Sequence, residues 1–142
     1  MPARNFYITN RLAAAIGAAG ARCEAIIDGP VLFVDSTTAC EPDAMVRCGD
    51  PLDGETVRVT DPVIIVEILS PSTRGRDTGA KLADYFRLPS LHHYLIVNTG
   101  NRTLIHHARA AHGTILTRIL RDGPIMLDPP RITLTDPFPP GA

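Results

Sequence analysis

Two carboxylates stand at positions from which they could hold a metal ion. Asp43 follows a proline at the start of a short extended segment, and Glu67 follows an apolar, β-branched run over 63–66. If those segments are neighbouring strands, both carboxylates converge at one edge of the sheet. Two close carboxylates repel, so one keeps its proton unless a cation lies between them. Hard oxygen ligands favour Mg²⁺ or Mn²⁺, and we therefore expect one of these ions at Asp43 and Glu67.

Lys81 and Tyr85 are the candidate catalytic partners of such a metal. Both lie on a helix predicted over 77–88, and the turn before that helix can fold it back along the sheet. The Lys81 ammonium group could then reach a metal-bound water or a phosphate oxygen. Tyr85 shares a helix face with Lys81 because it lies four residues further along, and its hydroxyl could assist by hydrogen bonding.

Arg74 and Arg76 lie between Glu67 and Lys81, in a segment that predicts a loop. Their guanidinium groups could contact phosphates beside the carboxylates. Arg74 could instead form an ion pair with Glu67, and both arginines could be solvated loop charges. The sequence leaves these alternatives open.

The other candidates also have ordinary structural explanations. Asp43 can cap a turn after the preceding proline. Lys81 can form an exposed i,i+4 pair with Asp77, which would contribute only ~0.3–0.5 kcal/mol. Tyr85 can be a packed residue whose hydroxyl reaches water.

The surrounding segments predict the scaffold. The apolar run over 63–69 indicates a strand buried on both faces. It is followed by the helix over 77–88 and a second strand over 92–98, which together predict a βαβ unit with a right-handed crossover. Residues 5–19 predict an amphipathic first helix. We therefore expect an α/β fold in which a mixed central sheet is flanked by helices.

Shorter patterns predict the remaining connections. Asp28-Gly29 separates two apolar runs and predicts a hairpin or a tight turn between them, although Pro30 limits pairing at the start of the second strand. Residues 50–62 are rich in Pro, Gly and Asp and indicate a loop. The runs over 102–109 and 113–120 predict another hairpin, and the proline-rich tail over 122–142 is expected to be irregular. The whole chain over 1–142 is expected to form one domain.

Composition excludes several classes of protein. The chain has 142 residues, of which 44% are hydrophobic and 20% are charged, as in globular domains. The net charge of −1 argues against nucleic-acid binding by bulk charge, although a local basic patch remains possible. No apolar run reaches the ~18 residues of a membrane-spanning helix. Residues 11–21 resemble a secretory signal, but their pattern favours the amphipathic helix.

Cysteine and histidine offer weaker signals. Three cysteines without a C-x-x-C spacing predict neither a disulfide framework nor a zinc site, and favour a reducing cytoplasm. The histidines include two adjacent pairs, His92-His93 and His106-His107. Neighbours on a strand point to opposite faces, so a histidine metal site is not expected.

Three segments carry a resemblance to a known family: EPDAMVRCG, DPVIIVEILSPST and RDTGAKLADYFRLPSLHHYLIVN. They resemble the Uma-type bacterial restriction endonucleases, within the PD-(D/E)XK, or restriction-endonuclease-like, superfamily, and the similarity covers about residues 5–120. The resemblance implies a Mg²⁺-dependent endonuclease that hydrolyses DNA. It also implies that Asp43, Glu67 and the backbone carbonyl of Ile68 bind the metal. Lys81 matches the helical lysine of this family, whereas the superfamily commonly places its lysine two residues after the second acid, here Leu69.

The sequence departs from that family in two ways. Family members usually begin with an extra helix and hairpin, which are not recognisable before residue 5, and Asn5 stands where they usually have a histidine. The alternative is therefore a catalytically silent, nuclease-derived domain that binds DNA or a protein. We also expect a symmetric homodimer, because surface that the missing segment would cover is left bare.

Overall fold

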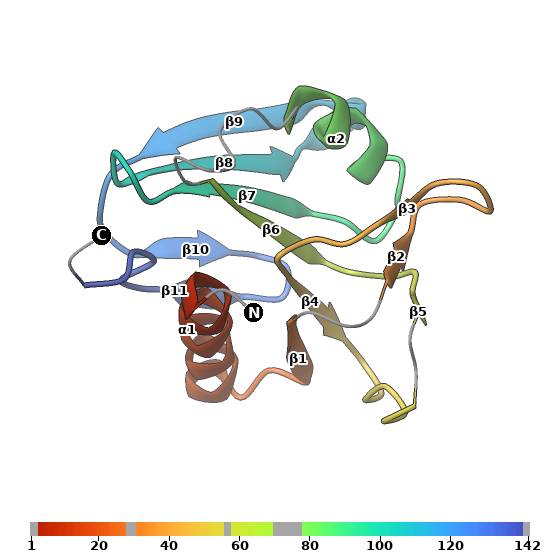
Figure 1. The fold of residues 1–142 in the computed structure, drawn as a ribbon, viewed down its shortest axis with the longest axis horizontal. Coiled ribbons are helices and arrows are strands. Elements are labelled where there is room, and N and C mark those ends of the chain that lie inside the picture. The colour runs from red at the N-terminus through yellow and green to blue at the C-terminus, as the bar shows by residue number, and fades with distance from the viewer. Residues whose placement is uncertain (1–2, 28–30, 56–57, 70–77, 141–142) are drawn as a thin grey trace.

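The structure is a computed structural model that describes residues 3–27, 31–55, 58–69 and 78–140 (Figure 1). Its centre is a six-stranded sheet in the order β1-β4-β6-β7-β8-β9. β6 and β7 are parallel, and the other neighbouring pairs are antiparallel. The strands are β1 Cys23–Ile27, β4 Ala44–Cys48, β6 Ile64–Leu69, β7 His93–Asn98, β8 Thr103–Arg109 and β9 Ile115–Leu120.

One face of the sheet is covered by helix α1 (Ala3–Ala19) and by a hairpin of β10 (Ile125–Leu127) and β11 (Ile132–Leu134) (Figure 1). Ile8 and Leu12 of α1 are buried with Ile64 and Val66 of β6 in one core cluster. This packing explains the amphipathic pattern of the first helix, which was predicted over 5–19.

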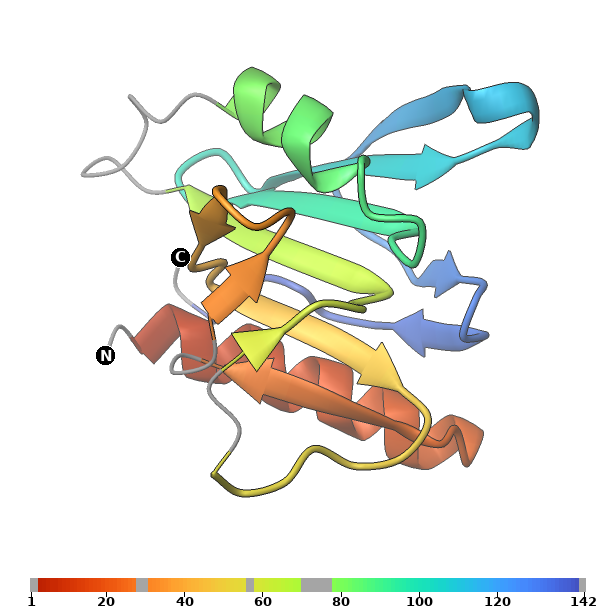
Figure 2. The ribbon, with the colours of Figure 1, turned by 90° about the vertical axis from the view of Figure 1, so that its right-hand side faces the viewer.

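The opposite face carries helix α2 (Thr78–Tyr85) and a small three-stranded sheet (Figure 2). That sheet has the order β3-β2-β5 and contains Ala39–Cys40, Val31–Phe33 and Arg58–Val59. Leu32 and Tyr85 from these elements are buried with Ile65 of β6 in a second cluster. The two helices therefore lie on opposite faces of the central sheet.

β6 and β7 are the two strands of the central sheet with five buried residues each. Residues 64–68 of β6 are buried, alternating between the α1 and α2 faces. β6 and β7 lie in parallel, with α2 between them in the sequence, as the βαβ pattern predicted. The mixed α/β architecture that was expected from the sequence is confirmed.

Of the two alternatives at Asp28-Gly29, the hairpin is wrong, and the tight turn falls on residues 28–30, which lie outside the described part. β1 pairs with β4, whereas β2 pairs with β3 and β5. The two apolar runs belong to different sheets, because β1 adds to the central sheet beside α1 and β2 packs over the opposite face.

Part of the segment after Asp122 is regular, where an irregular tail was expected. β10 and β11 form an antiparallel hairpin whose apolar residues alternate with exposed ones. Ile125, Leu127, Ile132 and Leu134 are buried against α1 and the sheet. The prolines at 129–130 lie in the connection between the strands, where a missing N–H does not interrupt the ladder.

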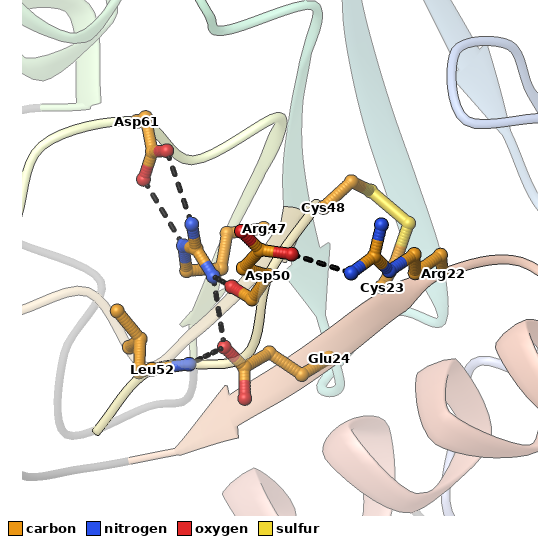
Figure 3. Close-up of polar contacts among 8 residues, drawn as sticks. All are labelled: Arg22, Cys23, Glu24, Arg47, Cys48, Asp50, Leu52 and Asp61. Atoms are coloured by element: carbon orange, nitrogen blue, oxygen red, sulfur yellow. Dashed lines mark hydrogen bonds and ion pairs between the residues drawn. A yellow bond between two sulfur atoms is a disulfide. The ribbon is translucent and has the colours of Figure 1, made fainter.

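The expectation that the cysteines are unpaired is also wrong. Cys23 of β1 faces Cys48 of β4, and the two form a disulfide with a Cα–Cα distance of 3.9 Å (Figure 3). Arg47, beside Cys48, bonds Glu24 and Asp61 with N–O distances of 3.1 Å each. Antiparallel pairing brings together two cysteines that are 25 residues apart in sequence. Cys40 is the free cysteine.

Removal of this disulfide should destabilise the protein. The cross-link closes a loop of 25 residues, and loops of this size contribute about 3 kcal/mol by restricting the unfolded chain. We expect dithiothreitol, or the double substitution Cys23→Ser/Cys48→Ser, to lower the free energy of unfolding in urea by about that amount. A Cys40→Ser control should show the same difference in the free energy of unfolding between oxidised and reduced protein as the wild type. Identical urea midpoints with and without reductant would show that the bridge does not form.

No helix in the described part of the chain is long and apolar enough to cross a membrane.

Candidate functional site

Glu67 is the centre of the candidate site. It lies in β6 on the face that α2 covers, and its side chain is completely buried. The Lys81 ammonium group lies 3.1 Å from Oε1 of Glu67, and the Tyr85 hydroxyl donates a hydrogen bond of 2.8 Å to the same oxygen. The buried charge is therefore stabilised by a cation and a hydroxyl from the helix that follows the strand.

Helix α2 delivers both partners from one face. Lys81 and Tyr85 are four residues apart, so their side chains lie one above the other along the helix. Tyr85 is fully buried and packs edge-on against Tyr94 of β7, with ring centroids 5.1 Å apart. Lys81 keeps 31% of its side chain exposed. The aromatic contact fixes the helix, and the lysine above it can face both Glu67 and solvent.

Burial is the main cause of the pKa shifts of Glu67 and Tyr85. Burial raises the pKa of Glu67, whereas the Tyr85 hydrogen bond and the Lys81 charge oppose that rise. The pKa of Tyr85 is raised far above its ordinary value, first by burial and then by the Glu67 charge. Tyr85 therefore stays protonated at neutral pH and acts as a donor to Glu67.

Asp43 approaches the same end of β6 from the neighbouring strand. Ala44 of β4 lies opposite Val66, so Asp43 directly precedes the paired residues. Its Oδ2 accepts a hydrogen bond of 2.7 Å from the backbone N–H of Ile68. The Asp43 charge also raises the pKa of Glu67, as expected for two carboxylates in one site.

Asn5 of α1 joins this group. It is buried, and its side-chain amide lies 3.4 Å from Oδ1 of Asp43. The two oxygens of Asp43 are thus directed by α1 on one side and by β6 on the other. Asn5 was noted from the sequence as a departure from the related family, but its contact with Asp43 was not predicted.

The donor set fits a hard divalent cation. The N–H and C=O groups of one residue on a strand point toward the same neighbour, so the Ile68 carbonyl faces the side from which its N–H reaches Asp43. Carboxylate and carbonyl oxygens are the ligands that Mg²⁺ and Mn²⁺ prefer. Among the described residues, no three His, Cys, Asp or Glu side chains gather at one point. A metal here would therefore depend on two carboxylates, a backbone carbonyl and water.

Some predicted contacts fall outside the described residues. Arg74, Arg76 and Asp77 belong to the segment 70–77, so their proposed roles stay predictions. The suggestion that the Tyr85 hydroxyl reaches water is wrong, because that residue is completely buried. Lys81 contacts Glu67 and therefore has a role beyond an exposed helical pair.

One signal was missed in the sequence, and one neighbour of the site leaves no signal there. Lys81 is the only lysine of the chain, whose other basic residues apart from histidine are arginines. Lysine and arginine are not interchangeable, because a planar guanidinium does not reproduce the compact ammonium group. Cys40 also borders the site: burial raises the pKa of its thiol, while the charges of Lys81 and Glu67 act on it. No local pattern marks Cys40, because it comes from the smaller sheet.

Comparisons with known proteins identify two relatives by sequence. A stretch of 73 residues is 37% identical to "Uncharacterized protein slr1290" of Synechocystis sp., covering 51% of this chain and 38% of that protein. A stretch of 75 residues is 32% identical to "Uncharacterized protein sll1609" of the same organism, covering 51% of this chain and 42% of that protein. The matches span less than half of either relative.

A solved structure shares the fold. It is described as "a putative nuclease belonging to DUF820" from Anabaena variabilis, and it superposes with a TM-score of 0.66 at 12% identity. The superposition covers 89% of this chain and 71% of that one. The family model described as "Uma2: Putative restriction endonuclease" matches residues 1–137. Because that match takes in nearly the whole chain, the protein belongs to the Uma2 family.

Proposed function

We propose that this protein is a Mg²⁺- or Mn²⁺-dependent endonuclease that hydrolyses phosphodiester bonds in DNA. The observation that carries the proposal is the meeting of Glu67 with the sole lysine of the chain, 3.1 Å apart, at the strand end that Asp43 also reaches. A purely structural ion pair would not require lysine in a chain that otherwise uses arginine. Membership of a family described as restriction endonucleases supports the same reaction class.

Asp43, Glu67 and the Ile68 carbonyl would hold the metal. When bound, such an ion lowers the pKa of a coordinated water and neutralises charge on the scissile phosphate. Asn5 and the Ile68 N–H keep Asp43 in place through hydrogen bonds to its two oxygens. Tyr85 orients Glu67 through its hydrogen bond. The Tyr85 hydroxyl keeps its proton near neutral pH, because its pKa is strongly raised.

Lys81 is the residue proposed to act on the reacting atoms. It compensates the Glu67 charge in the metal-free protein. Its partial exposure lets the ammonium group donate to an attacking water or to a phosphate oxygen that gains charge in the transition state. Arg74 and Arg76 are proposed to contact neighbouring phosphates of the DNA backbone.

Cleavage of DNA by purified protein tests the proposal. We expect nicking or cutting with Mg²⁺ or Mn²⁺ and none with EDTA. Lys81→Met, which keeps the length of the side chain, should lower the rate by about 10²–10³-fold, while leaving the affinity for Mn²⁺ within a few-fold. Lys81→Arg should be similarly impaired, because a guanidinium does not reproduce the ammonium geometry.

Arg121→Met is the matched control, since it removes one exposed positive charge outside the site. It should cleave like the wild type. Full activity of Lys81→Met would remove the lysine from the mechanism. Metal binding and DNA binding by the wild type without any cleavage would favour the alternative, a catalytically silent domain derived from a nuclease.

A further inference from the structure

Strand β9 presents an unusual combination of apolar side chains and a free edge. It is the last strand of the central sheet, and its first five residues are all exposed. Ile115, Leu116 and Ile119 are 38%, 57% and 69% exposed, although large apolar residues are rarely left in such a group on a monomer surface. Figure 1 shows β9 at one border of the sheet, with no further strand beside it in the described chain.

The direction of the backbone groups on this edge follows from the turn before it. The Ala110 N–H donates to the Thr114 carbonyl, so Thr114 faces β8. Backbone direction alternates along a strand, and the N–H and C=O groups of Ile115, Thr117 and Ile119 therefore point away from β8. An edge of this kind is a template for another strand, and it usually carries several charged side chains, proline or a bulge when pairing must be avoided. β9 contains one charged residue, Arg118, and no proline.

The sequence of β9 fits a copy of itself. A two-fold axis normal to an antiparallel pair requires one residue to lie opposite its own equivalent. With Thr117 on the axis, Ile115 lies opposite the partner's Ile119, and Thr117 lies opposite the partner's Thr117. Apolar contacts and Thr–Thr pairs across strands both favour this register. The outward backbone groups at these three positions would then all be hydrogen-bonded.

The two neighbouring registers give less favourable cross-strand pairs than the register centred on Thr117. An axis at Arg118 would place two guanidinium groups directly opposite each other, which is unfavourable. An axis at Leu116 would place Ile119 opposite the partner's Gly113 and leave its side chain without an apolar partner. On the second face of the Thr117 register, Leu116 meets the partner's Arg118, whose aliphatic stem can cover it. The net charge of −1 per chain does not oppose association.

We propose that the protein forms a symmetric homodimer in which β9 pairs antiparallel with β9 of a second copy, with Thr117 at the two-fold axis. The central sheet then runs continuously through both protomers. The partner strand is β9 of a second copy, because the apolar and threonine positions of β9 are self-complementary about Thr117. It does not depend on the nuclease activity, since no candidate site residue lies in β9.

Sedimentation velocity over a range of protein concentrations tests the interface. The wild type should be a dimer, and Ile119→Lys should shift the dissociation constant upward by at least about tenfold. Ile119 is 69% exposed, so at concentrations where both proteins are monomeric the substitution should leave the thermal unfolding midpoint unchanged. Met126→Lys is the matched control, because Met126 is a 55% exposed apolar residue on β10. That variant should remain a dimer.

A cross-linking variant tests the register. In a Cys40→Ser background, Thr117→Cys should form an intermolecular disulfide on mild oxidation, whereas Thr133→Cys, on the exposed side of β11, should not. A monomeric wild type at high micromolar concentration would overturn the proposal. A dimer that is equally stable with Ile119→Lys, or that is not cross-linked through Thr117→Cys, would place the interface elsewhere and overturn it as well.

Discussion

Replacement of Glu67 by glutamine is expected to abolish metal-dependent cleavage, lowering the rate by at least about 10²–10³-fold. Glutamine keeps the shape of the side chain and can still accept the Tyr85 hydrogen bond, but it removes the charge that the metal and Lys81 require. The measurement is the initial rate of plasmid nicking at saturating Mg²⁺ for the wild type and Glu67→Gln, with Asp43→Asn as a second variant that removes the other carboxylate.

The fold should survive the Glu67→Gln substitution. Burial raises the pKa of Glu67, so the folded protein disfavours its charged form, and a neutral isostere should be at least as stable without metal. Urea unfolding in EDTA checks this point. Asp122→Asn, which neutralises an exposed carboxylate, is the control for activity and should cleave normally. Equal cleavage by wild type and Glu67→Gln would place the activity at another site or in a contaminant.

The second large effect concerns acid stability and depends on two buried histidines. Nδ1 of His93 lies 2.9 Å from Nε2 of His106, and Nε2 of His93 lies 2.9 Å from the Pro129 carbonyl oxygen. A carbonyl only accepts, so His93 donates from Nε2 and accepts at Nδ1 from the N–H of His106. On the far side, Nδ1 of His106 lies 3.3 Å from Nη2 of Arg118, a donor. Every ring nitrogen in this series of hydrogen bonds has a partner when both rings are neutral.

Burial lowers the pKa of both histidines to about 4, from an ordinary value of 6.5. The unfolded chain therefore takes up protons at these residues as the pH falls below about 6.5, while the folded protein does not. Stability is fully present above the unfolded pKa and is lost as the pH falls toward about 4. A difference of this size between the folded and unfolded pKa values corresponds to several kcal/mol for the pair.

We therefore expect the free energy of unfolding to decrease by several kcal/mol between pH 7 and pH 4. The experiment is urea unfolding at half-unit pH intervals. The double variant His93→Phe/His106→Phe should have a much flatter pH profile, whatever its absolute stability, because neither position can then be protonated. His112→Gln, an exposed histidine in the β8–β9 turn, should keep the wild-type slope. A wild-type profile that is flat over this range would contradict the buried, neutral pair.

The strand, helix and strand around Glu67 could be predicted because each has a strong local pattern. An uninterrupted β-branched run identifies β6, and the spacing of apolar residues in 77–88 identifies α2. The position of Asp43 beside β6 was a conditional prediction, since sequence does not state which strands are neighbours. The observed pairing of β4 with β6 meets that condition.

The missed features all depend on distant contacts. Pairing of β1 with β4, rather than with β2, places Cys23 opposite Cys48 and creates the disulfide. The proline-rich composition predicted an irregular tail, whereas alternate apolar residues of β10 and β11 pack against α1. Asn5 approaches Asp43 because α1 packs across the sheet, which no local pattern indicates. These contacts between elements could therefore not be predicted before the fold was known.

Titration calorimetry of Mn²⁺ and Mg²⁺ into the metal-free protein tests the central claim, that Asp43 and Glu67 form one cation site, most directly. We predict a single ion per chain for the wild type, with Mn²⁺ and Mg²⁺ competing for it, and loss of binding in Glu67→Gln and in Asp43→Asn. Asp122→Asn should bind like the wild type. No measurable heat with either ion, or equal affinity in the wild type and both site variants, would contradict the account.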